Sequence, residues 1–244
     1  MSVDWFMVYG VWCMVVNDKQ STQILYSIHH TPYTINHKPL KMETIVQNMP
    51  GYWLNEYMLV LSPHEELRNK ILGVKKDFAE KFKCQQANWG KPHLMLARFS
   101  QYEMMEERVV NRLRSTAMGF HPIKVELKNF GSYPSHSIII NVLSREPIKE
   151  LVREIRESQR LFKIDNEHKP YFTDDPHILV AGKLSPWQYE SGWLEYSHRH
   201  FTGRFIAVDM LLLKRRTGDK AWQIMDRLAF QNLPVTIKQG ELFG

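Results

Sequence analysis

Two short stretches with the same pattern constrain the fold of this chain most. Each places a histidine directly after a proline, at the head of an apolar run typical of a buried strand: residues 92–98 read PHLMLAR and residues 176–183 read PHILVAGK. The two histidines, His93 and His177, are 84 positions apart. The repetition predicts a duplicated unit in which each copy brings one imidazole to a shared cleft.

The elements around these motifs follow one order in both halves of the chain. Strands are predicted at residues 57–61, 93–99, 123–127, 137–142, 177–184, 204–214 and 221–230, and helices after the first, second, fourth and fifth of these. S-x-x-E patterns at Ser62 and Ser100 mark the expected starts of the first two helices. The order predicts an α+β fold over residues 56–232: a bilobal, pseudo-two-fold duplicated domain whose two antiparallel sheets face a central groove, with helices outside.

The first 55 residues do not follow this pattern, and we expect an irregular N-terminal extension there, with a C-terminal tail at 233–244. The apolar run Trp5–Val16 is shorter than the roughly 20 residues that cross a bilayer, and a basic flank is missing. We therefore predict neither a membrane helix nor a signal peptide; an over-extended start or a loosely attached arm explains the segment. Its histidines lack the spacing of a known metal site: His29, His30 and His37.

The charge is concentrated after this extension. The formal net charge is +6; residues 1–56 hold three lysines and four acids, a balance of −1, so the remainder carries +7. This surplus suits an acidic partner such as RNA or a phosphorylated metabolite, although a merely basic surface explains it equally well. The two cysteines, Cys13 and Cys84, form no CxxC pair, which favours a reducing cytosol and disfavours a thiolate metal site. We predict a cytoplasmic monomer without cofactor.

Two histidines on opposite sides of a groove can serve one phosphodiester as base and acid. One removes a proton from the attacking hydroxyl or water and the other protonates the leaving oxygen, each contributing about 100- to 10,000-fold. This chemistry requires no metal. The alternative is that His93 and His177 are structural residues at strand ends, hydrogen-bonded to backbone; the shared context of the two favours function.

The paired PH strands within this bilobal order resemble the 2H phosphoesterase superfamily, and more closely its bacterial 2'-5' RNA ligase-like proteins. The resemblance covers about residues 56–230. It implies motifs of the form H-x-T or H-x-S, in which the histidines act as acid and base on 2',3'-cyclic phosphates or 2'-5'-linked RNA and the hydroxyls hold phosphate oxygens. His93 and His177 match the histidine positions.

The hydroxyl positions do not match, because Met95 and Leu179 occupy them. Residues i and i+2 of a strand share a face, so both side chains project into the same groove as the histidines but cannot donate a hydrogen bond. Losing one preorganised donor costs about 3–4 kcal/mol, or roughly 100- to 1,000-fold in rate. Two such losses predict a very weak enzyme or none.

Other residues could compensate for the missing donors. Strict alternation sends Arg98 to the opposite face from His93, and Lys183 lies six residues beyond His177, about 20 Å along a strand. The better candidates for substrate binding are in the loop that the resemblance places beside the substrate: Tyr133, Ser135 and His136.

Two functions from different classes remain open on the sequence. The first is a metal-independent phosphodiesterase or ligase-like enzyme acting on RNA ends or a small cyclic nucleotide, with His93 and His177 as the proton-transfer pair. The second is a degenerate domain that binds a nucleotide or phosphorylated ligand without turnover. A purely structural protein ranks last.

Overall fold

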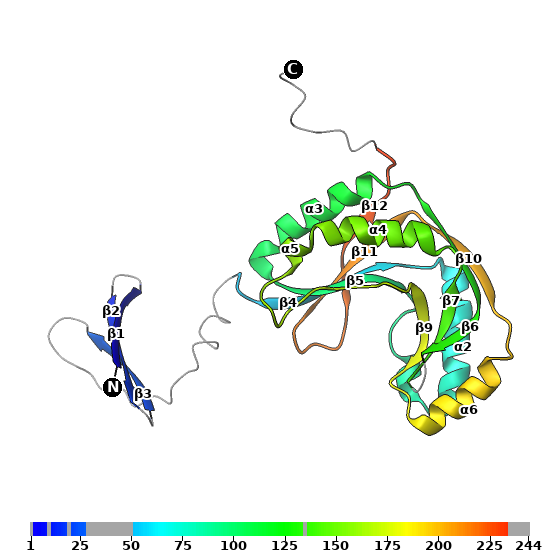
Figure 1. Ribbon diagram of the computed structural model, residues 1–244, viewed down its shortest axis with the longest axis horizontal. Coiled ribbons are helices and arrows are strands. Elements are labelled where there is room, and N and C mark those ends of the chain that lie inside the picture. The colour runs from blue at the N-terminus through cyan, green and yellow to red at the C-terminus, as the bar shows by residue number, and fades with distance from the viewer. Residues whose placement is uncertain (1, 9–10, 19–20, 28–50, 134–135, 234–244) are drawn as a thin grey trace, which may run out of the picture. The chain divides into compact units, whose positions relative to one another are not determined.

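The computed structural model describes residues 2–8, 11–18, 21–27, 51–133 and 136–233, shown in Figure 1. The chain divides into two compact units, Met1–Trp53 and Leu54–Gly244. The first unit contains a three-stranded antiparallel sheet in the order β1 (Ser2–Val8), β2 (Val11–Asp18) and β3 (Ser21–Ser27).

This sheet corrects the prediction of irregular structure over residues 1–55. The apolar run Trp5–Val16 is divided between β1 and β2, whose valine, tryptophan and phenylalanine residues favour strands. The three N-terminal histidines and the tail residues 234–244 lie outside the described part of the chain. No helix within the described residues is long and apolar enough to cross a membrane.

The second unit is built on one nine-stranded antiparallel sheet. Its strands are β4 (Leu54–Leu61), β5 (Leu94–Tyr102), β6 (Ile123–Tyr133), β7 (Ser137–Val142), β8 (Tyr171–Phe172), β9 (His177–Gly182), β10 (Thr202–Ala207), β11 (Asp209–Arg216) and β12 (Gln223–Ala229). The order along the sheet is β10-β6-β7-β9-β5-β4-β11-β12, and β8 pairs with β5. The α+β class is confirmed, but the two predicted sheets are two halves of one sheet. In the described residues the halves are joined where Leu94 of β5 pairs with Ile178 of β9.

Five α-helices accompany this sheet in the described residues: α2 (Glu65–Lys81), α3 (Glu106–Met118), α4 (Arg145–Glu157), α5 (Gln159–Phe162) and α6 (Pro186–Tyr196). The helix α2 connects β4 to β5 in one half, yet it contacts β9 and β10 of the other half. The helix α4 connects β7 to β9 and in turn contacts β5. Each half is thus covered by a helix from the other, as Figure 1 shows, and the halves are interlocked.

The sheet has two distinct faces at the junction of its halves. Leu94, Leu96, Ile178 and Val180 are buried in the main core, which includes apolar residues of the helices. Because strand side chains alternate, the residues between and before them project from the other side. We call this side the histidine face; at the junction it carries His93, Met95, His177 and Leu179.

Both motif strands contain a β-bulge at the same distance from their histidine. In β5 the extra residue is Leu96, because Leu59 pairs with Ala97 while Val60 pairs with Met95. In β9 it is Val180, because Ile138 pairs with Ala181 while Ile139 pairs with Leu179. A bulge changes the alternation of side chains beyond it. The matching bulges, three residues after His93 and His177, support the predicted duplication.

The predicted helix starts are wrong in detail. The helix α2 begins at Glu65 with His64 as its N-cap, and Ser100 lies within β5, which continues to Tyr102. A capping box occurs instead at α6, where Gln188 donates its backbone N–H to Ser185 Oγ at 3.4 Å and its side chain accepts from the Ser185 N–H at 3.1 Å. Tertiary pairing of β5 thus extends the strand through a helix-start pattern.

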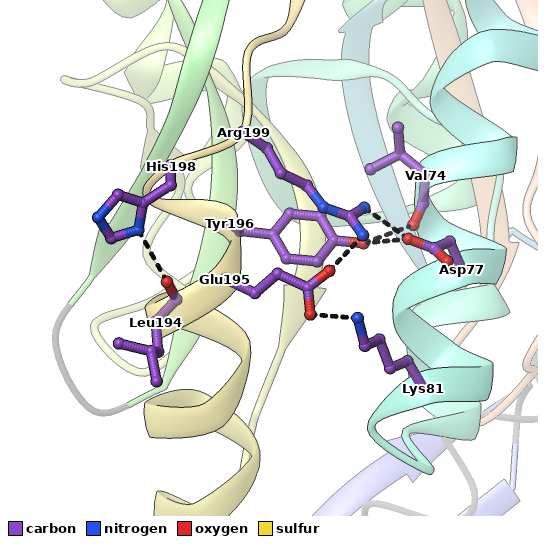
Figure 2. Close-up of polar contacts among 8 residues, drawn as sticks. All are labelled: Val74, Asp77, Lys81, Leu194, Glu195, Tyr196, His198 and Arg199. Carbon is purple, nitrogen blue, oxygen red and sulfur yellow. Dashed lines mark hydrogen bonds and ion pairs between the residues drawn. The ribbon is translucent and has the colours of Figure 1, made fainter.

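A polar cluster holds α6 against α2, as Figure 2 shows. The buried Tyr196 donates its hydroxyl to Asp77 Oδ2 at 3.1 Å, with the Val74 carbonyl oxygen 3.3 Å away. Arg199 donates to the same Asp77 oxygen at 2.6 Å and also forms an ion pair with Glu195. Lys81 forms a second ion pair with Glu195, with its Nζ 2.5 Å from Oε2. Hydrogen bonds from Arg199 and Tyr196 outweigh burial and hold the pKa of Asp77 below its ordinary value. The cluster fixes the part of α2 that lies next to Lys75.

The variant Tyr196→Phe tests this clamp. It removes a buried hydroxyl that bonds a carboxylate, so we expect the free energy of unfolding, measured by urea titration, to fall by about 1–2 kcal/mol. The variant Tyr171→Phe is the control, because Tyr171 is 53% exposed. Equal unfolding free energies of the two variants would contradict a stabilising role of the Tyr196 hydroxyl.

Candidate active site

The two motif histidines come together because their strands pair at the residues that follow them. His93 immediately precedes β5, and His177 is the first residue of β9. Since Leu94 lies opposite Ile178 in an antiparallel pair, His93 is diagonal to His177 on the histidine face, and Met95 and Leu179 complete the quartet. Both imidazoles are half-buried.

The two imidazoles are held by equivalent backbone hydrogen bonds. His93 Nδ1 lies 2.8 Å from the carbonyl oxygen of Lys91, and His177 Nδ1 lies 2.7 Å from that of Asp175. A carbonyl only accepts, so each Nδ1 carries the hydrogen and each neutral ring presents Nε2 as its basic nitrogen. In both motifs the carbonyl is two residues before the histidine, and the intervening proline restricts the backbone there. A histidine with a purely structural role would make the same hydrogen bond from Nδ1 to a backbone carbonyl, but here this bond leaves Nε2 available for proton transfer.

A buried lysine lies near His93. Lys75 of α2 is 6% exposed, and its ammonium donates to the carbonyl oxygens of Trp89 and Gly90 at 3.0 and 3.1 Å, just before the first motif. Burial lowers the pKa of Lys75. Burial also lowers the pKa of His93; the Lys91 carbonyl opposes this shift and the charge of Lys75 adds to it. The surroundings of His93 therefore favour its neutral form.

A chain of polar groups supports His177. The Tyr133 hydroxyl donates to Asp175 Oδ2 at 2.7 Å, and its oxygen lies 3.1 Å from His177 Nδ1. Arg145 Nη1 is 3.2 Å from Asp175 Oδ1. Burial and the hydrogen bond to Asp175 raise the pKa of Tyr133 to about 12, with a smaller contribution from Tyr171. Tyr133 thus keeps its proton and orients the imidazole of His177.

A hollow lies over β6 and β7, and β7 pairs with the strand that carries His177. Asn141 pairs with His177 in the register, and its Nδ2 donates to the Phe130 carbonyl at 3.0 Å. Its place depends on Gly131, where an added Cβ would lie 2.3 Å from Asn141 Oδ1. The hollow has a volume of about 420 Å³ and is lined by Lys128, Asn129, Asn141, Val142, Leu143 and Arg145. Its two cations, Lys128 and Arg145, and its two amides, Asn129 and Asn141, can bind an anion.

The surroundings of His93 on the same face are apolar. Met58, Val60 and Leu211 form a second, small hydrophobic cluster. Met95, Leu213 and Trp222 pack against it. Met95 is half-buried in this contact, whereas Leu179 is 46% exposed. Neither side chain can anchor a phosphate oxygen, as the sequence predicts.

Arg98 requires a correction, because strict alternation places it on the wrong face. The bulge at Leu96 changes the alternation, so Arg98 pairs with Met58 just as Met95 pairs with Val60. Arg98 therefore lies on the histidine face, and its guanidinium lies over the Trp222 ring at 5.8 Å. Lys183 lies beyond the end of β9, with a positive φ of 54°, and does not extend that strand.

Of the three loop residues predicted to bind substrate, the structure describes two near His177. Tyr133 is brought to His177, and His136 stacks on Tyr133 with ring centroids 6.1 Å apart and planes 10° apart. Ser135 lies outside the described residues. Sequence reasoning missed Lys75, Asn141, Arg145 and Asp175; the one available signal was that Asp175 and Lys91 hold the same position before the two PH pairs.

No group of three or more His, Cys, Asp and Glu side chains in the described part of the chain could hold a metal ion.

Comparison with solved structures supports this fold. A structure titled as a phosphoesterase is 13% identical, with a TM-score of 0.54, and the match covers 72% of this chain and 98% of that one. LigT of E. coli in its apo form is 14% identical, with a TM-score of 0.52 and the same coverage of 72% and 98%. LigT complexed with phosphate is 12% identical, with a TM-score of 0.51 over 73% and 98% of the two chains. At these identities the likeness concerns the fold.

A search of curated proteins gives no match. The family model described as "2'-5' RNA ligase superfamily" matches residues 62–219, which contain both motif strands. This match covers more than half of the chain and includes strands from both interlocked halves of the sheet. The chain therefore belongs to the 2'-5' RNA ligase superfamily of 2H phosphoesterases.

Proposed function

We propose that this protein is a 2H-type phosphodiesterase or RNA ligase-like enzyme that acts on RNA ends or 2',3'-cyclic phosphates without a metal. The observation that carries the proposal is the equivalent placement of His93 and His177. Both lie on one face, and both are fixed through Nδ1 with Nε2 left for substrate. Arg145, which pairs with Asp175, and Lys128 line one hollow of about 420 Å³, and their positive charges suit this substrate class. Action as a cytosolic monomer stays a prediction from the sequence.

We assign the base to His93 and the acid to His177 in the hydrolysis of a cyclic phosphate. His93 Nε2 takes a proton from the attacking water, whose oxygen bonds to phosphorus. The bond from phosphorus to one ribose oxygen breaks, and His177, which enters the reaction with both ring nitrogens protonated, gives its Nε2 proton to that oxygen. The burial of His93 beside Lys75 favours the neutral imidazole that a base needs. Proton exchange with solvent restores both rings, and the same steps with a hydroxyl of a second strand in place of the water join two ends.

The alternative is a domain that binds a nucleotide or phosphorylated ligand without turnover. It is favoured by Met95 and Leu179, since neither hydrophobic side chain can stabilise charge on a phosphate oxygen. The Asn141 amide and the nearby cations would still hold a ligand. Turnover therefore decides between the two functions.

The double variant His93→Ala with His177→Ala tests the proton-transfer pair. With an oligonucleotide ending in a 2',3'-cyclic phosphate, we expect the wild type to release a linear phosphate and the variant to lose at least about 100-fold in kcat/KM. Chromatographic product analysis measures the rate. The exposed His121 provides the matched control, and His121→Ala should keep the wild-type rate. Wild-type turnover no faster than that of the double variant would leave ligand binding as the function.

Restoring the hydroxyls tests the identity of the phosphate site. The pair Met95→Thr with Leu179→Thr should raise kcat by about tenfold or more, because each hydroxyl adds a donor to the developing charge. The pair Met95→Val with Leu179→Val is nearly the same in shape but has no hydroxyl, and should leave kcat unchanged. If the two pairs behave alike, the phosphate is not held beside Met95 and Leu179.

The variant Lys75→Met tests the electrostatic part of the assignment. Removing a positive charge near His93 raises its pKa, and a base works only in its neutral form. We therefore expect the acidic limb of the profile of kcat/KM against pH to move to higher pH. Lys75→Arg, which keeps the charge, and Lys76→Met at an exposed neighbour should leave the limb in place. NMR titration of the His93 ring gives the same readout without turnover; an unchanged His93 pKa would refute the assignment.

A further inference from the structure

A second group of charged and aromatic side chains lies on the histidine face, near the middle of β5. Arg98 Nη2 bonds Glu56 Oε2 at 2.5 Å, and Arg215 bonds the same oxygen through Nη2 at 2.7 Å and Nε at 3.2 Å. Both guanidinium groups lie over the Trp222 ring, at 5.8 and 4.5 Å from its centroid. The aromatic ring and the apolar cluster beneath it hold the two cations in place.

This group has an unneutralised positive charge. Two guanidiniums share one carboxylate, which leaves a net charge of +1. Hydrogen bonds from Arg215 and Arg98 outweigh partial burial and keep the pKa of Glu56 below its ordinary value, so the carboxylate is charged at neutral pH. The Arg98 side chain is 48% exposed and that of Glu56 is 18% exposed. Guanidinium has five N–H donors in a fixed fork that matches phosphate, and those of Arg98 not used by Glu56 are accessible.

An exposed aromatic ring lies beside this cation. Tyr171 of β8 pairs directly with Arg98 of β5, so the two side chains share the histidine face. Tyr171 is 53% exposed, and it is near enough to Tyr133 to contribute to the raised pKa of that hydroxyl. It therefore connects the position of Arg98 with the surroundings of His177. A cation next to an exposed ring is the combination that binds a phosphate and stacks a base of single-stranded nucleic acid.

We propose that Arg98 and Tyr171 form a binding subsite for a nucleotide of single-stranded RNA beyond the one that reacts at the histidines. This inference rests on the proposed function and names its substrate class as oligonucleotides rather than mononucleotides. Arg98 is five residues from His93, or about 15 Å along the strand. A mononucleotide at the histidines does not span that length, whereas a strand with further nucleotides does. Arg98 binds its phosphate, and Tyr171 stacks on a base.

Direct binding separates this subsite from the histidine site. Two probes are compared by calorimetry: a single-stranded RNA of about six nucleotides with a 2',3'-cyclic phosphate end, and the corresponding 2',3'-cyclic mononucleotide, both on the His93→Ala, His177→Ala background so that neither is consumed. We expect Arg98→Ala to weaken binding of the oligonucleotide by about tenfold and to lower the magnitude of the slope of log K against log salt by about 1. The affinity for the mononucleotide should not change. Tyr171→Ala should also weaken binding of the oligonucleotide, whereas Tyr171→Phe, which keeps the ring, should bind it as the wild-type residue does.

The matched control is Arg114→Ala. Arg114 is 52% exposed and forms one ion pair, with Asp226 at 2.8 Å, much as Arg98 does with Glu56. Arg98→Lys keeps the charge without the fork and should bind with intermediate affinity, and thermal melts confirm that each variant is folded. Equal losses for Arg98→Ala and Arg114→Ala, or an equal loss for both probes with Arg98→Ala, would overturn the subsite.

Turnover is measured separately on the background with both histidines intact. If the oligonucleotide is cleaved at a rate that does not depend on Arg98, the subsite is refuted and the proposed function is retained. If oligonucleotide binding depends on Arg98 but no cleavage occurs, the enzymatic function is refuted and the subsite is retained. With both present, Arg98→Ala raises KM for the oligonucleotide and leaves kcat unchanged, since Arg98 lies far from the reacting atoms.

Discussion

The pairing of Leu94 with Ile178 is the contact on which the rest of this structure depends. It joins the two halves of the sheet and, because each residue follows a histidine, it sets His93 and His177 diagonally on one face. Both residues are fully buried, so a slip of one position would bring their side chains to solvent and the imidazoles into the core. The interlocked helices oppose such a slip, since α2 and α4 each connect strands of one half while contacting strands of the other. Folding and assembly of the site are thus the same event.

The backbone of the two motifs is duplicated while the side chains around them are not. Each motif has the same bulge and the same hydrogen bond from Nδ1 to a carbonyl two residues earlier. Around His177 there are a tyrosine, a carboxylate and an arginine, whereas His93 has an apolar cluster and a buried lysine. Base and acid need different pKa values, and different surroundings are how one repeated geometry supplies them. The backbone thus places the two rings equivalently, and under the proposed mechanism the different side chains around them set the direction of proton transfer.

Sequence reasoning succeeded where one local pattern decides the outcome. Proline before histidine, followed by an apolar run, predicted both motif strands, and the period of two in a strand predicted the face shared by His93 and Met95. It failed where pairing partners decide: strict alternation misplaced Arg98, because the extra residue of a bulge is defined by the neighbouring strand. The role of Lys75 could not be predicted either, because its partners are backbone carbonyls of a loop, which every residue has and which the sequence therefore does not mark. The N-terminal strands were missed because their apolar run was judged for length rather than for strand propensity.

Met95 and the cation at Arg98 are connected through one apolar cluster. Met95 packs into the cluster of Met58, Val60 and Leu211, and Trp222 packs on the same cluster while its ring supports Arg98 and Arg215. A threonine at position 95 would place a hydroxyl beside His93 but would remove part of the apolar support of Trp222. Under the proposed function, Met95 offers no donor to the reacting phosphate but supports a cation farther along the strand. The proposed subsite would then supply binding energy through a neighbouring group, and remote contacts of this kind can position a long substrate that a short one cannot match.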